Sequence, residues 1–189
     1  MDSEEIGKWD EESERAWQHD NHDVTMPEPI VTLLSNILAP HAKILDAGCG
    51  IGKHLKALQM LGYDAQGIDQ SKKAVEYATQ LNPDAQIIHM RIQDLAFVNM
   101  FNLIHTCAVL QHSKHERKQE ILKRFYTALK PLGYYLCTEN TFPEGKESDG
   151  YSFTEKGWID FMATNGFNHL TTIPPWPYML YQKRYCSNV

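Results

Sequence analysis

The chain has 189 residues, a formal net charge of −6 at pH 7, 42% hydrophobic residues and 22% charged residues. These values are ordinary for a globular chain, and the length predicts a single domain over residues 1–189 with a core of its own. The acidic balance and the lack of a long basic run disfavour nucleic acid as a partner. No apolar run reaches the roughly 18 residues of a membrane-spanning helix, so no membrane partner is expected.

The cysteines and the amino terminus indicate a compartment. Cys49, Cys107, Cys137 and Cys186 are widely spaced and form no Cys-x-x-Cys pair. This spacing is typical of reduced thiols, and of neither a disulfide framework nor a zinc site. The first residues are acidic and lack the apolar segment of a secretory signal. We therefore expect a cytoplasmic protein that binds no metal.

Residues 1–40 are predicted to form a helical arm. The polar segment 1–26 carries Trp9 and Trp17 at a spacing that lets both share one helix face, which predicts one helix or two. The amphipathic segment 30–38 predicts a further helix.

The segment after the arm predicts a strand, a glycine turn and a helix. Residues 43–47 include a short apolar run, and Gly48, Gly50 and Gly52 follow at every second position. Closely spaced glycines let the backbone turn with positive φ and let a ligand lie against the main chain. The helix expected over residues 52–61 adds free N–H groups and the positive end of its dipole. We therefore expect a ligand at this turn.

The rest of the chain predicts alternating strands and helices, which is typical of a parallel α/β sheet. A turn is expected over residues 129–133, a helix cap at Ser113 and a long polar loop over residues 141–152. Strands are expected at residues 64–68, 85–90, 102–109, 134–137, 167–173 and 178–185, and helices at residues 71–80, 114–130 and 154–165.

Polar residues follow two of these strands at their carboxyl ends. Gln111 and His112 follow the fourth predicted strand, and Glu139 and Asn140 follow the fifth. In a doubly wound sheet, ligands bind beyond the carboxyl ends of the strands. These four side chains are therefore expected near a ligand.

The glycine turn has a specific form, Leu45-Asp46-Ala47-Gly48-Cys49-Gly50-Ile51-Gly52. It departs from the dinucleotide fingerprint G-x-G-x-x-G, because its third glycine comes one position early and Lys53 stands where that glycine would be. The stretch instead resembles the first motif of class I S-adenosylmethionine-dependent methyltransferases. The resemblance extends over roughly residues 40–185.

That resemblance implies a fold and a cofactor. The implied fold is a Rossmann-like, doubly wound α/β sheet of seven strands, mostly parallel with an antiparallel C-terminal hairpin strand, and with helices on both faces. The implied cofactor is S-adenosyl-L-methionine. The arm of residues 1–40 is expected to lie over the cofactor site.

Several positions match residues that bind the cofactor in the family. Asp69, at the tip of the second predicted strand, stands where an acid binds both ribose hydroxyls, although it also fits a helix cap. Asp94 stands where an acid binds the adenine amino group, although it also fits a turn. The cofactor-binding residues that the resemblance implies are Asp46, Gly48, Cys49, Gly50, Gly52, Asp69, Gln70, Gln93, Asp94 and Cys107.

The acceptor side has fewer constraints. In-line methyl transfer needs a base only when the nucleophile arrives protonated, so the family has no fixed catalytic residue. His112 is the strongest candidate base because imidazole titrates near neutrality, with helix capping or orientation of the substrate as alternatives. Glu139 and Asn140 are candidates for binding an amine or hydroxyl of the acceptor.

Together these observations predict an S-adenosylmethionine-dependent methyltransferase that acts on a small-molecule acceptor by in-line displacement. A protein N-terminal amine is an alternative acceptor, and a non-catalytic S-adenosylmethionine-binding protein is a further alternative. An NAD-dependent oxidoreductase is disfavoured by Asp46 and Lys53, and an RNA acceptor by the lack of a basic extension. Neither the acceptor atom nor the oligomeric state follows from the sequence.

Overall fold

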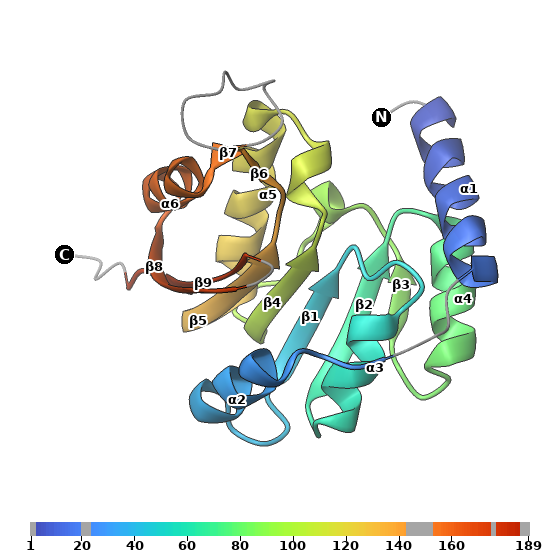
Figure 1. Cartoon of the computed structure of the whole chain (residues 1–189), viewed down its shortest axis with the longest axis horizontal. Helices are drawn as coiled ribbons and strands as arrows, with labels where there is room; N and C mark the ends of the chain where they lie inside the picture. The colour runs from blue at the N-terminus through green and yellow to red at the C-terminus, as the bar shows by residue number, and fades with distance from the viewer. Residues whose placement is uncertain (1–2, 20–23, 143–152, 175–176, 186–189) are drawn as a thin grey trace. The chain divides into compact units, whose positions relative to one another are not determined.

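The structure is a computed structural model that describes residues 3–19, 24–142, 153–174 and 177–185 (Figure 1). Seven strands form one sheet in the order β3-β2-β1-β4-β5-β9-β8, and a second, two-stranded sheet pairs β6 with β7. Most pairs of the large sheet are parallel, whereas β9 pairs antiparallel with both β5 and β8. The predicted seven-stranded α/β sheet with antiparallel C-terminal strands is therefore confirmed.

The chain divides into two compact units, residues 1–94 and residues 95–189. The first unit contains α1 (Ser3–His19), α2 (Glu28–Ile37), β1 (Lys43–Ala47), α3 (Lys53–Met60), β2 (Asp64–Asp69), α4 (Lys72–Leu81), β3 (Ile87–His89) and the 3-10 helix η1 (Ile92–Asp94). Strand β1 pairs parallel with β2, and β2 pairs parallel with β3. Side chains with no exposed surface in this unit include Ile30, Leu34, Ile44, Leu45, Leu55, Leu58 and Ile68.

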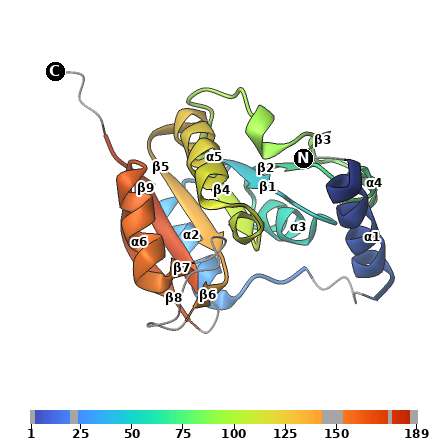
Figure 2. The ribbon, with the colours of Figure 1, turned by 90° about the horizontal axis from the view of Figure 1, so that it is seen from above.

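Helix α1 packs along α4 within the first unit (Figure 1, Figure 2). The rings of Trp17 and Tyr77 stack with their centroids 4.7 Å apart. The Tyr77 hydroxyl donates a hydrogen bond to the Glu14 carboxylate, and this bond raises the pKa of Tyr77 to about 12. The amino-terminal segment, for which the sequence predicts one helix or two, forms a single helix over its described residues.

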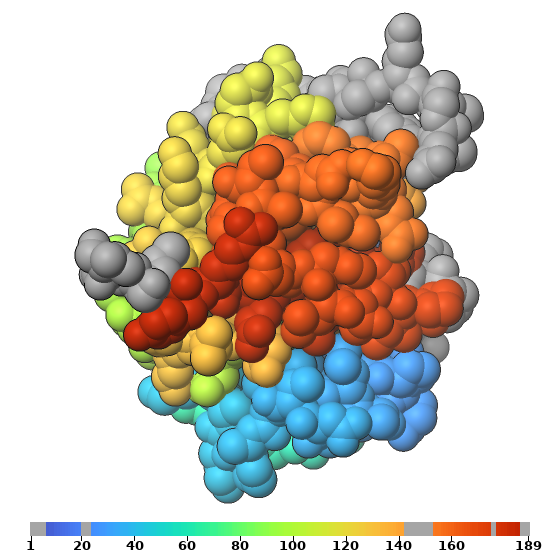
Figure 3. Space-filling view, turned by 90° about the vertical axis from the view of Figure 1, so that its left-hand side faces the viewer, coloured from blue at the N-terminus to red at the C-terminus, as the bar shows by residue number. Residues whose placement is uncertain are grey.

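The second unit contains β4 (Phe101–Cys107), the 3-10 helix η2 (Leu110–His112), α5 (His115–Ala128), β5 (Leu129–Thr138), β6 (Thr141–Phe142), β7 (Phe153–Thr154), α6 (Glu155–Thr164), β8 (Phe167–Ile173) and β9 (Tyr178–Lys183). Tyr135 of β5 is fully buried at the centre of its aromatic core, with the rings of Phe125, Phe167 and Tyr181 at 5.3, 6.0 and 6.2 Å. In Figure 3, α6, β8 and β9 (orange to red) lie together on one face of this unit.

Strand β5 begins earlier than the sequence predicts. Residues 129–133, for which a turn is predicted, lie inside β5. Phe101 of β4 pairs with Leu129, and Leu103 already pairs with Tyr134, so the residues between them bulge out of the ladder. The predicted turn is therefore wrong as a boundary, because the chain resumes the same strand after the bulge.

The end of β4 and the start of α5 also differ from prediction. The strand ends at Cys107 because Ala108 has a positive φ of 55°, which breaks an extended strand. Helix η2 follows, and Ser113 stands at its C-terminal end, whereas Lys114 is the N-cap of α5. The predicted helix cap at Ser113 is therefore wrong, because Ser113 closes the preceding 3-10 helix.

Of the remaining predicted elements, the strands over residues 43–47 and 167–173 have the predicted ends, and the others are present with shifted ends. Strand β3 is shorter than the segment 85–90, and β9 ends at Lys183 rather than at residue 185. The predicted loop over 141–152 begins with β6, and its residues 143–152 lie outside the described residues.

Candidate functional site

The glycine turn joins β1 to α3 in the first unit. The N–H groups of Gly48 and Cys49 both donate to the carbonyl of Ile68, at 2.8 and 3.0 Å, so the turn is bound to β2. Gly52 is the N-cap of α3 with a φ of 85°. A Cβ at Gly52 would lie 2.5 Å from Nδ2 of Asn82. Only glycine fits here, because both the backbone angle and the space exclude a side chain.

The other side of the turn is open and faces an acid. A Cβ placed at Gly50 would meet no atom within 4 Å. The N–H of Gly50 donates to Oδ2 of Asp69 at 2.9 Å, and the N–H of Ser71 donates to Oδ1 at 2.8 Å. Burial raises the pKa of Asp69, and these two hydrogen bonds oppose the rise. The carboxylate therefore joins the tip of β2 to the glycine turn.

The cap of α4 is Ser71 rather than Asp69. The hydroxyl of Ser71 accepts a hydrogen bond from the N–H of Ala74 at 3.0 Å, as an N-cap side chain does. Besides these two N–H groups, the N–H of Gln70 also acts to lower the pKa of Asp69. A carboxylate has about four acceptor positions, so it can also accept a hydrogen bond from a ligand.

Two further predicted cofactor-binding residues, Asp46 and Cys49, are buried beside or within the glycine turn. Asp46 is 2% exposed and stands inside β1, opposite Gly67 of β2. Burial, followed by the charges of Asp46 and Asp69, raises the pKa of the Cys49 thiol. A Cβ at Gly67 would lie 2.9 Å from Sγ of Cys49, so β2 presents bare backbone to this thiol.

The last three predicted residues of this unit follow β2 and β3. The carbonyl of Gln70 accepts a hydrogen bond from Nε2 of His89 at 2.9 Å. Gln93 and Asp94 belong to η1. The Asp94 carboxylate accepts two hydrogen bonds from the Arg91 guanidinium, at 2.7 and 2.9 Å, and this pairing raises the pKa of Arg91. A bidentate pair fixes the direction of the exposed carboxylate. Its contact with adenine stays a prediction.

The other predicted residues lie in the second unit, at the ends of β4 and β5. Cys107 ends β4 and is not part of a disulfide. Glu139, directly after β5, is 2% exposed. Its two oxygens accept hydrogen bonds from the N–H groups of Leu110 and Gln111, at 3.0 and 2.9 Å. Burial raises the pKa of Glu139 to about 7, against the lowering effect of these bonds.

The side chain of Gln111 lies between Asn140 and His112, within hydrogen-bond distance of both. The N–H of Asn140 donates to Oε1 of Gln111 at 2.7 Å. Nε2 of Gln111 lies 3.4 Å from Nε2 of His112, which is the last residue of η2. The side chains of Asn140 and His112 are exposed. The second unit therefore brings His112, Glu139 and Asn140 together, as the positions after adjacent strands predict.

Sequence reasoning missed two contacts around the glycine turn. Nδ2 of Asn82 donates to the carbonyl of Gly52 at 3.1 Å. Oδ1 of Asp10, on α1, accepts hydrogen bonds from the Ser71 hydroxyl at 2.6 Å and from the N–H of Lys73 at 3.2 Å. Asn82 precedes a proline, which signals a helix end and not a contact with the turn. Asp10 carries no local signal, because its partners come from a distant segment.

Lys118 was also missed, because its sequence context reads as a solvated helix face. The side chain has no exposed surface, and its ammonium donates to the carbonyl of Ser113. The ammonium lies 5.7 Å from the ring centres of both Phe153 and Trp158, which is within the range of a cation–π contact. Lys118 therefore joins the start of α5 to the elements β7 and α6.

Two findings bear on partners. Over the described ranges, no three His, Cys, Asp or Glu side chains gather closely enough to hold a metal ion. Over the same residues, every helix falls short of the length and apolar character needed to cross a bilayer.

Comparison with known proteins gives a family match. Residues 44–133 match a family model described as a methyltransferase domain. Over these residues, which are just under half of its length, the chain is similar to methyltransferases. The matched range includes the glycine turn, Asp69, Asp94 and the turn after β4. The predicted resemblance to methyltransferases is therefore confirmed over these residues, and the match supports the predicted cofactor, S-adenosylmethionine.

Individual methyltransferases resemble the chain over different shares of their length. An uncharacterized methyltransferase of Synechocystis is 31% identical over 103 residues, which cover 54% of this chain and 49% of that protein. A dTDP-3-amino-3,6-dideoxy-alpha-D-glucopyranose N,N-dimethyltransferase of Streptomyces fradiae is 28% identical over 106 residues, covering 54% and 41%. The chain thus spans about half the length of the curated relatives it matches.

A solved structure extends the likeness to the fold. The 1,6-didemethyltoxoflavin-N1-methyltransferase of Burkholderia thailandensis, solved with 1,6-didemethyltoxoflavin and S-adenosylhomocysteine, matches with a TM-score of 0.75 at 16% identity. The match covers 96% of this chain and 87% of that one. The methyltransferase fold therefore extends over nearly the whole chain.

Proposed function

We propose that this chain transfers the methyl group of S-adenosylmethionine to a small-molecule acceptor. The match of residues 44–133 to a methyltransferase domain supports the reaction class. The names of two similar proteins support the acceptor class, since one methylates an amino sugar nucleotide and the other 1,6-didemethyltoxoflavin. A cytoplasmic location stays part of the proposal, supported by Cys49, Cys107 and Cys137, which are not in disulfides.

The glycine turn fits the cofactor. The single observation that carries this proposal is the Asp69 carboxylate, held against the N–H of Gly50 beside an open face of the turn. An acid with free lone pairs accepts ribose hydroxyls, and bare backbone admits a ligand closely. When bound, S-adenosylmethionine supplies an activated methyl group on a positively charged sulfur. We assign the cofactor contacts to the predicted residues Asp46, Gly48, Cys49, Gly50, Gly52, Asp69, Gln70, Gln93, Asp94 and Cys107.

The chain's part in methyl transfer is to hold the acceptor in line, at about 3–3.5 Å between the reacting atoms. We assign this task to the exposed side chains of His112 and Asn140, at the ends of β4 and β5. Where the acceptor carries a proton, His112 is the proposed base, since a neutral imidazole takes a proton near pH 7. An acceptor with a lone pair already free needs only the orientation.

Calorimetric titration with S-adenosylhomocysteine tests the cofactor, with NAD as the control ligand. The test compares the wild type with Asp69→Asn and with Asp84→Asn, which changes an exposed acid away from the turn. We expect the wild type and Asp84→Asn to bind equally, and Asp69→Asn to bind at least about tenfold more weakly. Binding of NAD alone, or of neither ligand, would contradict the proposal.

An acceptor panel then tests turnover. Formation of S-adenosylhomocysteine is followed by mass spectrometry with N-heterocycles, amino sugars, phenols and a peptide with a free amino terminus. Product with a small molecule supports the proposed acceptor class. Product with the peptide alone selects the protein N-terminal amine, and binding without any product selects a non-catalytic S-adenosylmethionine-binding protein.

A further inference from the structure

The turn between β4 and α5 begins with a strained residue. Ala108 has a φ of 55°, which is uncommon for a residue other than glycine, and its N–H donates to the Thr138 carbonyl at 2.7 Å. Such a conformation persists where the surroundings fix it, and it is frequent at functional sites. The turn carries Gln111 and His112, so what fixes it also fixes these two side chains.

A buried carboxylate fixes the middle of this turn. Oε1 of Glu139 accepts a hydrogen bond from the N–H of Leu110 at 3.0 Å, and Oε2 accepts one from the N–H of Gln111 at 2.9 Å. The Thr106 hydroxyl lies 3.4 Å from Oε1. Hydrogen bonds to an ionised carboxylate are stronger than those between neutral groups. With 2% of its surface exposed, Glu139 lies behind the turn and not in the solvent-facing part of the site.

The same contacts orient the side chains of Gln111, which is half-buried, and His112, which is exposed. A backbone N–H can only donate, so the bond from Asn140 identifies Oε1 as the carbonyl oxygen of the Gln111 amide. The NH₂ group of Gln111 therefore faces Nε2 of His112 at 3.4 Å. This arrangement favours the imidazole tautomer that carries its proton on Nδ1.

The end of the turn is held from the other side. Lys118, buried in α5, donates to the carbonyl of Ser113. Aromatic rings of Phe153 and Trp158 lie near its ammonium. Contacts from β5, α5 and the turn itself therefore determine the conformation of residues 108–113.

We propose that Glu139 is a positioning residue, whose carboxylate holds the turn of residues 108–113 and through it orients Gln111 and His112 toward the acceptor. The inference rests on the proposed function, because it assigns these two side chains to the acceptor side of the methyltransferase. It distinguishes Glu139 from Asn140, whose exposed side chain can touch an acceptor directly.

Ionisation of Glu139 is expected to change this hold near neutral pH. A proton on either oxygen removes one of the two acceptors for Leu110 and Gln111. The titratable groups that interact with Glu139 are Tyr135 and Cys137 on β5 and Tyr181 on β9. Burial raises the pKa values of Tyr135, Cys137 and Tyr181, so these three stay neutral over the same range.

Amide NMR of the ¹⁵N-labelled full chain tests the proposal. Wild type, Glu139→Gln and the exposed control Glu120→Gln are titrated from about pH 5 to about pH 9. In the wild type and the control, the amides of Leu110 and Gln111 should titrate with a midpoint near 7. In Glu139→Gln this titration should disappear and the ring signals of His112 should move. Glutamine keeps the shape but has one acceptor oxygen, so it stands for the protonated state.

Binding and turnover separate positioning from a merely structural role. Affinity for S-adenosylhomocysteine should stay within about twofold in all three proteins, while kcat for an acceptor from the panel falls about tenfold in Glu139→Gln. Amide signals of Leu110 and Gln111 that keep both their positions and their titration in Glu139→Gln, or a kcat in this variant equal to that of the wild type, would overturn the proposal. If Glu139→Gln does not fold, titration of the same amides in His112→Gln decides, because that variant lacks the imidazole that can also titrate near pH 7. Failure of the proposed function has a different signature, since the wild type would then not bind S-adenosylhomocysteine.

Discussion

Asp69 accepts a hydrogen bond from the backbone N–H of Gly50, 2.9 Å away, and thereby joins the tip of β2 to the glycine turn. Its other oxygen accepts the N–H of Ser71 at 2.8 Å, at the start of α4. One side chain thus fixes three segments of the first unit before any ligand is present. This preorganisation has consequences for stability that are separate from ligand binding.

We expect Asp69→Asn to lower the free energy of unfolding by about 2 kcal/mol, because the amide NH₂ cannot accept the second N–H and leaves it without a partner. Denaturant unfolding followed by circular dichroism measures the change. The control Asp84→Asn should shift the free energy by less than about 0.5 kcal/mol, as exposed substitutions usually do. Equal unfolding midpoints for the two variants would show that the two N–H bonds contribute nothing.

Gly52→Ala and Gly62→Ala separate backbone strain from lack of space. Both glycines have a φ of 85°, but a Cβ at Gly62 meets nothing within 4 Å, whereas one at Gly52 lies 2.5 Å from Asn82. Gly62→Ala should therefore cost about 1 kcal/mol of stability through strain. Gly52→Ala should cost about 3 kcal/mol, because overpacking adds to the strain. Thermal and denaturant unfolding of both variants measure the difference, and similar costs would exclude the close contact.

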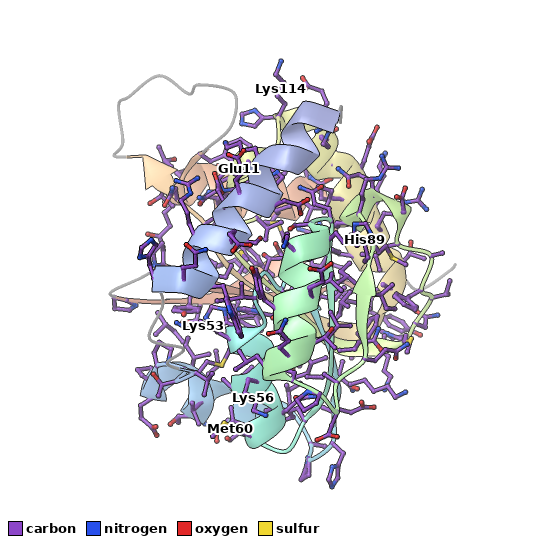
Figure 4. All side chains as sticks on the ribbon, turned by 90° about the vertical axis from the view of Figure 1, so that its right-hand side faces the viewer. Glu11, Lys53, Lys56, Met60, His89 and Lys114 are labelled. Carbon is purple, nitrogen blue, oxygen red and sulfur yellow. The ribbon has the colours of Figure 1, made fainter. Side chains whose placement is uncertain are left out.

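Asp10→Asn should loosen α1 from α4. The Asp10 carboxylate accepts hydrogen bonds from Ser71 and Lys73 at the N-terminal end of α4, where a negative charge also favours the helix dipole. Hydrogen exchange of peptides from α1 should become about tenfold faster, which corresponds to about 1.4 kcal/mol. Figure 4 shows α1 alongside α4 and labels Glu11, whose exposed side chain makes Glu11→Gln a matched control. Unchanged exchange in Asp10→Asn would mean that Trp17 and Glu14 hold the helix without it.

Stability should depend on pH through Glu139. The folded protein holds the Glu139 proton up to about pH 7, whereas the unfolded chain releases it near the ordinary value of 4.5. The stabilisation is therefore complete below about pH 4.5 and is lost as the pH rises to about 7. At 1.36 kcal/mol per pH unit, the unfolding free energy of the wild type should fall relative to Glu139→Gln by about 3 kcal/mol over this range. Denaturant unfolding at several pH values measures the difference, and a constant difference would show that the pKa of Glu139 is not raised.

The parts of the fold that the sequence predicts correctly rest on local chemistry. The glycine turn after β1 and the start of α4 at Ser71 each follow from a few neighbouring residues. Local chemistry also gives a wrong prediction where turn-forming residues lie inside a strand. Residues 129–133 contain proline and glycine and predict a turn, yet the strand continues past them as a bulge. The pairing partner in β4 decides this outcome, and it lies far away in the chain.

The candidate site likewise has features that the sequence predicts and features that it does not predict. Asp69 and Glu139 are found from their places after predicted strands. Their partners are not, because the bond from Leu110 to Glu139 joins positions 29 residues apart, and the bond from Ser71 to Asp10 joins positions 61 residues apart. Burial of Glu139 is equally hidden, since an acid at a strand end reads as exposed. The sequence thus identifies candidate residues, and the tertiary contacts determine which of them face a ligand.

The Cys49 side chain fills the space beside Gly67, because a Cβ on Gly67 would lie 2.9 Å from Sγ of Cys49. The residue at one of these positions therefore limits which side chains fit at the other. A side chain at position 67 requires Sγ of Cys49 to move or position 49 to become smaller, and Cδ2 of Leu55, 3.1 Å from the added Cβ, must also shift. The acceptable substitutions at these two positions should accordingly be inherited as a pair.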